Sequence, residues 1–378
     1  MIKPQIFYDT LSEHGLNTFA GVPDSLLKAL CAYVADNAAP QNNVTTANEG
    51  NAIGFAAGHY MATGKPAVVY MQNSGLGNTV NPLTSLTDPQ AYSIPALLIV
   101  GWRGEPDVKD EPQHKKMGEI TCSQLDLLGI PYSVIDKDTA NVADIIQTAS
   151  KHMAEKNSPY AIVVRKGAFE AYKLQSIVTT SFELSREDAV KLVADSVDES
   201  GVIVSTTGKT SRELFEHRVS KGQGHEKDFL SIGSMGHASS IALAIALAKP
   251  ERQVYCFDGD GAALMHMGSL PVIAGLSPSN YKHIVFNNGA HDSVGGQPTV
   301  GHGIDLPAIA LASGYKAAFK AETAEEVRAR LSEMQKMDGP VLLEILVNKG
   351  ARSDLGRPTN TPHGNRAAFM AALKGEIF

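Results

Sequence analysis

Polar residues that suit cation and phosphate chemistry follow two apolar, strand-like runs in the second half of the chain. The first run, QVYCF, leads into Gly259-Asp260-Gly261, and the second, KHIVF, leads into Asn287-Asn288. Ligands of open α/β sheets bind at the carboxyl ends of strands, where the N-terminus of a following helix suits a phosphate. A carboxylate and an amide oxygen are suitable Mg²⁺ ligands. Either turn alone could be an ordinary surface turn, but together, with 25 residues between Gly261 and Asn287, they predict a metal and diphosphate site.

A glutamate in the first half of the chain lies in a stretch with few charges. Glu49 begins EGNAIGFAAGHYMA, residues 49–62, which is rich in Ala and Gly and predicts a helix. An acid at this position commonly does no more than stabilise the helix N-terminus. A carboxyl group in apolar surroundings can instead keep a proton and donate it, because burial disfavours the charged form.

The elements that must position these groups form two similar halves. Continuous apolar runs between helical patterns predict parallel strands buried on both faces. These runs are residues 66–71, 95–100, 131–135 and 160–165 in the first half, and 201–205, 253–257, 282–286 and 341–347 in the second. Their alternation with helices predicts an α/β fold with two doubly wound parallel-sheet domains. We expect the join at residues 167–186, with Ser185 as a helix N-cap, and a single helix over residues 262–273.

Composition narrows the class of protein. The 378 residues are 43% apolar and 19% charged, which fits a folded chain of two or three domains. The net charge of −7 argues against nucleic-acid binding and requires local positive charge for any anionic substrate. Three widely spaced cysteines and an N-terminus without an apolar signal core lead us to expect a cytoplasmic protein without disulfides or a membrane segment.

The GDG and NN motifs, with their spacing, resemble the signature of the thiamine diphosphate enzymes. The resemblance implies that Mg²⁺ is bound by Asp260, by Asn288 rather than Asn287, and by the backbone carbonyl of Ala290. STTGKTSRELF resembles the family's other diphosphate turn, and Met235 in SIGSMGHASS matches the residue that props thiamine, although it could be an ordinary core methionine. The cofactor-binding residues implied in this half are Thr207, Gly208, Thr210, Ser234, Met235, Gly259, Asp260, Gly261, Ala262 and Asn288.

The pattern around Glu49, NExNAxxxAxGxxxxxGKP, resembles the pyrimidine-binding domain of thiamine-dependent decarboxylases. This resemblance implies that the Glu49 carboxyl group activates the cofactor, and that Gly75, Gly77 and Asn78 line the cofactor site. It also implies a pyrimidine-binding domain over residues 1–175, a diphosphate-binding domain over residues 185–378, and no middle domain. Since two subunits share one cofactor in this family, a homodimer or higher homo-oligomer with cofactor sites at the subunit interface is expected.

Candidate substrate contacts lie in two other stretches of the first half. GVPDSLLKAL resembles the family loop over the reacting carbon and makes Asp24 and Ser25 catalytic candidates, although a turn and helix N-cap would also explain them. GWRGEPDVKDEPQHKKMGEIT places Arg103, Lys109 and His114 near one strand end. Positive charge there suits a phosphonate, a sulfonate or a carboxylate. The adjacent Lys115 and Lys116 are expected to be solvated.

This cationic stretch, taken with NNGAHDSVGGQPT, resembles the phosphonopyruvate decarboxylases, and the related sulfopyruvate decarboxylases have similar motifs. The resemblance implies conversion of 3-phosphonopyruvate to phosphonoacetaldehyde and CO2 in phosphonate (2-aminoethylphosphonate) biosynthesis, with sulfopyruvate as the alternative substrate. Asp24, His114 and His291 are candidate proton carriers, which the sequence does not rank.

Three other classes of protein are less consistent with the motifs. A flavin-containing carboligase needs a middle domain, for which 378 residues leave little room. A non-catalytic relative would be expected to lack Glu49 or Asp260, and both are present. A nicotinamide dehydrogenase needs GxGxxG, and GLGNTV at residues 75–80 lacks the third glycine.

Overall fold

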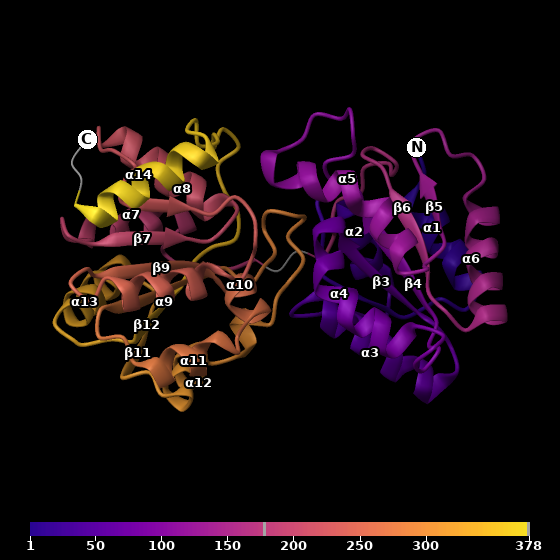
Figure 1. Ribbon diagram of the computed structural model, residues 1–378, viewed down its shortest axis with the longest axis horizontal. Helices are drawn as coiled ribbons and strands as arrows, with labels where there is room; N and C mark the ends of the chain where they lie inside the picture. Colours follow the sequence, from indigo (N-terminus) through magenta and orange to yellow (C-terminus); the bar gives the residue numbers. More distant parts are fainter. Residues whose placement is uncertain (177–178, 376–378) are drawn as a thin grey trace. The chain divides into compact units, whose positions relative to one another are not determined.

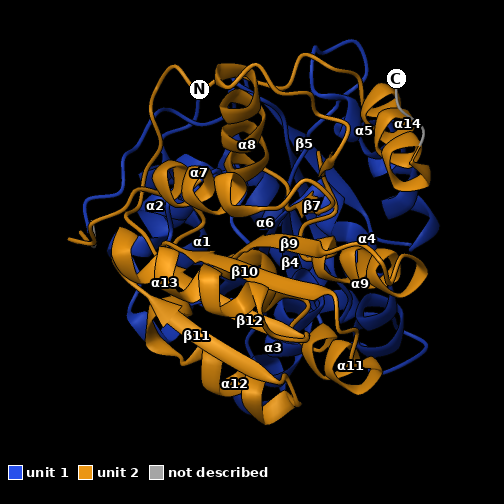
Figure 2. Cartoon of the chain, turned by 90° about the vertical axis from the view of Figure 1, so that its left-hand side faces the viewer, with its two compact units in different colours: residues 1–177, 293–297 blue, residues 178–292, 298–378 orange. Residues whose placement is uncertain are grey.

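The computed structural model describes residues 1–176 and 179–375, which form two compact units (Figure 1). Unit 1 comprises residues 1–177 and 293–297, and unit 2 comprises residues 178–292 and 298–378, as coloured in Figure 2. Each unit contains a six-stranded sheet whose neighbouring strands run parallel, with helices on both faces. The predicted α/β fold with two doubly wound parallel sheets is confirmed.

In unit 1 the strand order is β2-β1-β3-β4-β6-β5. The strands are β1 (Phe19–Gly21), β2 (Asn43–Thr45), β3 (Ala67–Gln72), β4 (Ala96–Gly101), β5 (Tyr132–Ile135) and β6 (Tyr160–Val164). One face is covered by α1 (Pro4–Glu13), α2 (Lys28–Asn37) and α6 (Val142–Lys156), and the other by α3 (Glu49–Thr63), α4 (Leu76–Pro82) and α5 (Pro112–Leu127). Short helical turns lie at Pro40–Asn42, Asn73–Gly75 and Leu83–Thr87. Both faces of this sheet are therefore buried under apolar side chains.

In unit 2 the strand order is β11-β12-β10-β9-β7-β8. The strands are β7 (Val202–Ser205), β8 (Asp228–Leu230), β9 (Val254–Gly259), β10 (Tyr281–Asn287), β11 (Ala317–Ala321) and β12 (Val341–Leu346). One face is covered by α7 (Arg186–Ser196), α8 (Lys209–Ser220) and α13 (Ala324–Gln335). The other is covered by α9 (Ala238–Ala248), α11 (Ser269–Leu276), α12 (Leu306–Ser313) and α14 (Pro362–Lys374). The short helix α10 (Asp260–Met265) packs Ala263 against this second face, and a short helical turn lies at Gly301–Gly303.

Local sequence explains where several of these helices begin and end. Asn48 caps α3 by accepting a hydrogen bond from the backbone N–H of Asn51 (3.0 Å), and Gly64, in the left-handed region, ends it. Ser185 caps α7 in the same way, accepting from the N–H of Asp188 (3.1 Å), as predicted.

Among the described residues, no helix is both long enough and apolar enough to span a membrane.

The predicted single helix over residues 262–273 is wrong. The structure ends α10 at Met265 and begins α11 at Ser269, so the helix is broken around Gly268. Glycine in a helix interior is unfavourable by about 1 kcal/mol relative to alanine, which makes this position a natural break.

Parallel strands bring the polar turns of each unit to one edge of its sheet. In unit 1, Asp24, Gln72 and Arg103 lie at or just beyond the carboxyl ends of β1, β3 and β4, which are neighbours. In unit 2, Thr207, Asp260 and Asn288 follow β7, β9 and β10, which are also neighbours. These edges are where open α/β sheets bind ligands.

Candidate functional site

The carboxylate of Asp260 lies buried at the start of α10 in unit 2. Its side chain is 2% exposed, and Thr299 Oγ1 donates a short hydrogen bond to Oδ2. Burial raises the pKa of Asp260 to about 6, against the opposing effect of the Thr299 hydrogen bond. Because burial disfavours the charged carboxylate, a cation bound beside it would stabilise the ionised form. The donor type and the burial fit a hard divalent metal ion.

The two asparagines at the end of β10 have different surroundings. Asn287 is fully buried, and its Nδ2 donates to Gly301 O (2.9 Å) and to Glu344 Oε1 (2.7 Å), while its Oδ1 accepts from the N–H of Gly289 (3.0 Å). Asn288 Oδ1 accepts one backbone hydrogen bond, from Ala290 N at 3.2 Å. An amide oxygen has two lone pairs, so Asn288 Oδ1 retains acceptor capacity for a metal ion. Asn287 Oδ1 also accepts only one of these bonds, but both hydrogen bonds donated by its Nδ2 hold its side chain against Gly301 and Glu344.

The side chains of the candidate residues Met235 and His291 approach Gly261 in unit 2. A Cβ atom added there would lie 3.0 Å from His291 Cε1 and 3.6 Å from Met235 Cε. Gly261 and Ala262 are buried in α10, directly after Gly259 and Asp260. The glycine therefore allows two side chains from distant segments to approach the backbone of the GDG turn.

The other candidate turn of unit 2 follows β7. Thr207 and Gly208 come directly before α8, Gly208 has φ of 98°, and Thr210 is buried within the first turn of the helix. Free N–H groups at this helix end suit a phosphate. Ser234 is exposed and also has a positive φ, of 55°.

Glu49 of unit 1 is 5% exposed at the start of α3. Its Oε2 accepts a hydrogen bond from Nδ2 of Asn78 (2.8 Å). Gly75 approaches so closely that an added Cβ atom would lie 2.5 Å from Glu49 Cγ. The structure thus brings Glu49, Gly75 and Asn78 together, as the sequence predicted for a shared site, whereas Gly77 is exposed with open space around it.

We expect Gly75→Ala to lower activity at least about tenfold, since the new methyl group must displace the Glu49 side chain and misplacing a catalytic group is costly. The backbone of Gly75 is helical (φ −71°), so alanine introduces no strain of its own. Gly58→Ala in α3 is the matched control, because an added Cβ there meets open space. Turnover measured for both variants decides the point, and equal rates would mean that the close approach to Glu49 is unimportant.

Asp24 is fully buried in unit 1, in a hydrogen-bonded setting. Gln72 Nε2 donates to Oδ1 (2.7 Å), and the N–H of Leu26 donates to Oδ2 (2.8 Å). Burial raises the pKa of Asp24 above its ordinary value, although these hydrogen bonds and the charge of Arg103 oppose the shift. A carboxyl group of this kind keeps a proton more readily than an exposed one.

Arg103 lies beside Ser25, but its charge is already paired. Its Nε donates to Asp110 Oδ2 (2.8 Å), its Nη2 donates to Asp110 Oδ1, and its Nη1 donates to Ser25 Oγ (2.8 Å). The N–H of Gly104 also donates to Asp110 Oδ2 (2.8 Å). The loop predicted as cationic is therefore neutralised at its centre, and an anionic substrate would meet the Nη1 side of the guanidinium.

The histidine and lysine candidates differ in charge and exposure. Burial, together with the charge of Arg103, lowers the pKa of His114 to about 4. Burial likewise lowers the pKa of His291 to about 4, so both imidazoles are neutral near pH 7. Lys109 is exposed, as are Lys115 and Lys116, for which solvation was expected.

Several polar residues of these two sites were not predicted from the sequence. Gln72 and Asp110 hold Asp24 and Arg103, Thr299 holds Asp260, and Asn73 Nδ2 donates to Arg103 O (2.8 Å). Asp110 lies only seven residues from Arg103, inside the stretch already recognised, so the alternation of charges there was the available signal. The other partners are separated by at least 30 residues and had no local signal.

The sequence matches the models of two domains of one protein family. Residues 4–127 match the N-terminal thiamine pyrophosphate (thiamine diphosphate) binding domain of the thiamine pyrophosphate enzymes, and residues 206–345 match their C-terminal thiamine pyrophosphate binding domain. A phosphonopyruvate decarboxylase of Streptomyces viridochromogenes is 36% identical, covering 94% of this chain and 91% of the relative. One of Streptomyces hygroscopicus is 35% identical, covering 96% and 92%. A sulfopyruvate decarboxylase of Methanosarcina acetivorans is 29% identical, covering 90% of each chain.

Both halves of the chain thus match cofactor-binding domains, and the relatives align over nearly its full length. The parallel-sheet architecture, with polar turns at the carboxyl edges of both sheets, agrees with those matches. The chain belongs to the thiamine pyrophosphate enzyme family, and it is a thiamine diphosphate-dependent 2-keto acid decarboxylase.

Proposed function

We propose that this enzyme decarboxylates 3-phosphonopyruvate to phosphonoacetaldehyde and CO2, with thiamine diphosphate and Mg²⁺, in phosphonate biosynthesis leading to 2-aminoethylphosphonate. The observation that carries the choice of substrate is the Arg103 guanidinium beside Ser25 and Asp24, in a chain 36% identical to a phosphonopyruvate decarboxylase. Arginine suits a tetrahedral oxyanion because its planar fork can donate several hydrogen bonds.

On this proposal, unit 2 residues hold the metal and the diphosphate. Asp260, Asn288 and the carbonyl of Ala290 would bind Mg²⁺, which is consistent with the buried carboxylate and the available amide oxygen. The diphosphate would be held by the two turns, through Thr207, Gly208, Thr210, Gly259, Gly261 and Ala262, and thiamine would lie against Ser234 and Met235. We assign residues 185–378 to this diphosphate-binding domain and residues 1–175 to the pyrimidine-binding domain.

When bound, thiamine diphosphate supplies the electron sink for decarboxylation. Glu49 would hydrogen-bond the pyrimidine ring nitrogen, with Asn78 orienting its carboxyl group and Gly75 and Gly77 leaving room for the ring. Asp24, His114 and His291 are the candidate proton donors to the reacting carbon. Burial raises the pKa of Asp24, whereas it lowers the pKa of His114 and of His291 to about 4, which leaves both imidazoles neutral near pH 7. Lys109 would contribute only long-range positive charge, since it is exposed.

We also propose a homodimer or higher homo-oligomer whose cofactor sites lie at the subunit interface, as the family resemblance implies. A cytoplasmic location is consistent with the three free cysteines, of which Cys31 and Cys256 are buried.

Steady-state rates with a panel of 2-keto acids test the substrate. The assay couples phosphonoacetaldehyde formation to a reporter enzyme and measures CO2 release for the other acids, with thiamine diphosphate and Mg²⁺ present. We expect the highest kcat/KM with phosphonopyruvate. Sulfopyruvate is the second candidate, because a sulfopyruvate decarboxylase aligns with 90% of this chain. A large preference for sulfopyruvate would replace the proposed substrate.

Arg103→Ala should raise the KM for phosphonopyruvate about 10- to 100-fold and change that for pyruvate little, since a hydrogen bond to a charged group contributes about 1.5–3 kcal/mol. This substitution also leaves Asp110 without its main partner. The double variant Arg103→Ala/Asp110→Asn removes that unpaired charge and should show the same selectivity. Equal losses for both substrates in both variants would mean that Arg103 does not contact the phosphonate.

A further inference from the structure

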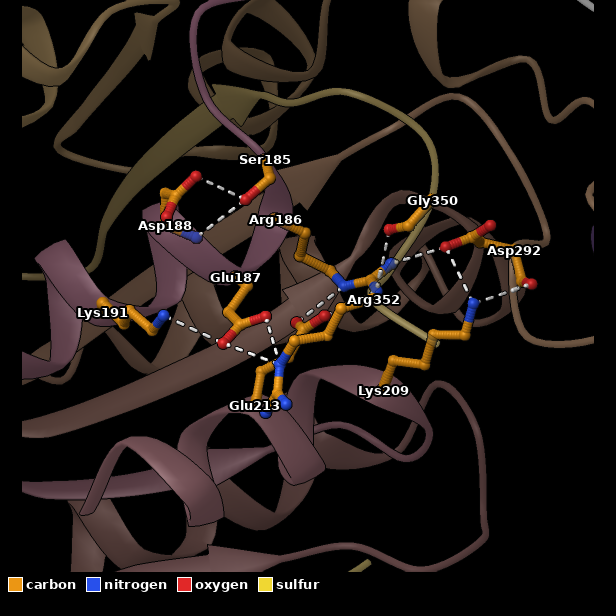
Figure 3. Close-up of polar contacts among 10 residues, drawn as sticks. All are labelled: Ser185, Arg186, Glu187, Asp188, Lys191, Lys209, Glu213, Asp292, Gly350 and Arg352. Atoms are coloured by element: carbon orange, nitrogen blue, oxygen red, sulfur yellow. Dashed lines mark hydrogen bonds and ion pairs between the residues drawn. The ribbon is translucent and has the colours of Figure 1, made fainter. Parts of the chain in front are cut away.

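A buried group of ion pairs in unit 2 begins at Arg186, the first residue of α7 (Figure 3). Its Nε and Nη2 donate to the two carboxylate oxygens of Glu213 (2.9 and 2.8 Å). Its Nη1 donates to Asp292 Oδ2 (3.2 Å). The side chains of Arg186, Glu213 and Asp292 are 6%, 1% and 10% exposed, so solvent screens these contacts little.

Asp292 connects this group to the candidate diphosphate-binding turn at Thr207 and Gly208. Lys209 Nζ donates to Asp292 Oδ2 (3.3 Å) and to its backbone carbonyl (3.4 Å), and Figure 3 shows both contacts from one ammonium group. Lys209 is the first residue of α8 and directly follows Gly208. The backbone N–H of Asp292 donates to the carbonyl of Ala290 (2.9 Å). Asp292 thus contacts both Lys209, which follows the Thr207–Gly208 turn, and the Ala290 carbonyl that is assigned to the metal ion.

The charges in this cluster balance. Glu213 and Asp292 supply two carboxylates, and Arg186 and Lys209 supply two cations, so that Asp292 has a cation on either side. Buried charges that are paired in this way resist rearrangement, because separating them leaves a charge unpaired in a poorly solvated place.

We propose that Asp292 and Lys209 are positioning residues. Their contact holds the loop that carries Asn288 and Ala290 next to the Thr207–Gly208 turn before the cofactor binds. This inference rests on the proposed cofactor site. Lys209 acts here through Asp292 and not as a ligand of the diphosphate, since both of its hydrogen bonds go to Asp292. Groups that orient the ligands of a site commonly change its affinity about 10- to 100-fold when they are removed.

The rival arrangement, in which Lys209 binds the diphosphate directly, predicts the opposite sign for one variant. Asp292 would then compete with the cofactor for the ammonium group, and Asp292→Asn would tighten cofactor binding. If Asp292 positions the loop, the same substitution weakens binding, because a neutral asparagine attracts Lys209 and Arg186 less strongly than a carboxylate does.

The test is isothermal titration calorimetry of the full-length protein with thiamine diphosphate at saturating Mg²⁺, and with Mg²⁺ at saturating cofactor. We expect Asp292→Asn and Lys209→Met each to raise both dissociation constants about tenfold or more. The dissociation constants of the double variant should not exceed the larger values found for the two single variants, because both substitutions break the same contact. Lys209→Arg, which can still pair with Asp292, should bind nearly as wild type.

Lys191→Met is the matched control. Lys191 Nζ pairs with Glu187 Oε1 (2.9 Å) on α7, at the exposed side of the same network, and touches neither turn. Its dissociation constants should equal those of the wild type. Thermal unfolding without cofactor reports whether each variant folds, and Lys209→Met, at a side chain 26% exposed, carries the test if Asp292→Asn does not fold.

The outcomes separate the inference from the function on which it rests. Tighter binding by Asp292→Asn, or unchanged constants for Lys209→Met, would overturn the positioning role and leave the proposed cofactor site intact. Wild-type protein that binds no thiamine diphosphate in the presence of Mg²⁺ would overturn the cofactor site itself.

Discussion

Replacing Glu49 with glutamine is expected to lower the decarboxylation rate about 100- to 10,000-fold while cofactor affinity stays within about threefold, as for the loss of an acid–base group. The substitution keeps the size of the side chain and its ability to accept the Asn78 hydrogen bond, so α3 and its surroundings should remain intact. It removes the acidic proton that the pyrimidine ring nitrogen would receive. The rate therefore falls because activation of the cofactor is lost, and the cofactor site persists.

Single-turnover rates with phosphonopyruvate, together with calorimetric titration of thiamine diphosphate, measure the two effects separately. Glu155→Gln, an exposed glutamate of α6, is the matched control and should behave as wild type. Normal turnover by Glu49→Gln would remove Glu49 from the activating role. Lost cofactor binding with a folded protein would instead make Glu49 a binding residue.

Replacing Asp260 with asparagine is expected to abolish Mg²⁺-dependent binding of thiamine diphosphate, with at least about a 100-fold rise in the dissociation constant. The side chain is 2% exposed, so water cannot substitute for the lost charge. Asparagine retains an oxygen that Thr299 can contact but supplies no negative charge to the metal. Activity should disappear with cofactor binding, in contrast to Glu49→Gln.

The same substitution should not weaken the protein without its cofactor. Burial raises the pKa of Asp260 to about 6, above the value of an exposed aspartate. The folded state therefore disfavours the ionised form, and this cost is fully present above about pH 6. A neutral asparagine avoids that cost, so the melting temperature of Asp260→Asn without cofactor should equal or exceed that of the wild type. Asp338→Asn, at an exposed position, is the control, and retained Mg²⁺-dependent binding by Asp260→Asn would exclude it as a metal ligand.

The strands that the sequence predicted are those with long apolar runs. All eight expected runs correspond to strands, for example residues 66–71 to β3 and 282–286 to β10. Four strands were not predicted: β1, β2 and β8 have three residues each, too few to show a pattern, and β11 is largely half-buried. Such short segments become strands because the neighbouring strand supplies their hydrogen bonds.

The same distinction applies to charge. The sequence indicated a cationic loop around Arg103, yet Asp110 pairs with that guanidinium and burial keeps His114 neutral near pH 7. A pKa and an ion pair depend on which groups surround a side chain in space, and a linear pattern of charges does not contain that information.

The sequence by itself determined the chemistry that this protein can hold. Buried strands ending in GDG, in NN and at Arg103, together with Glu49 at a helix start, were readable because residue type and spacing are local properties. Only the tertiary structure decided how those groups are held. Asn78 on Glu49, Gln72 on Asp24, and Asp292 between Arg186 and Lys209 are contacts between residues at least 29 positions apart. Such pairs arise from the order of strands in a sheet, which aligns the ends of segments that are distant in the chain.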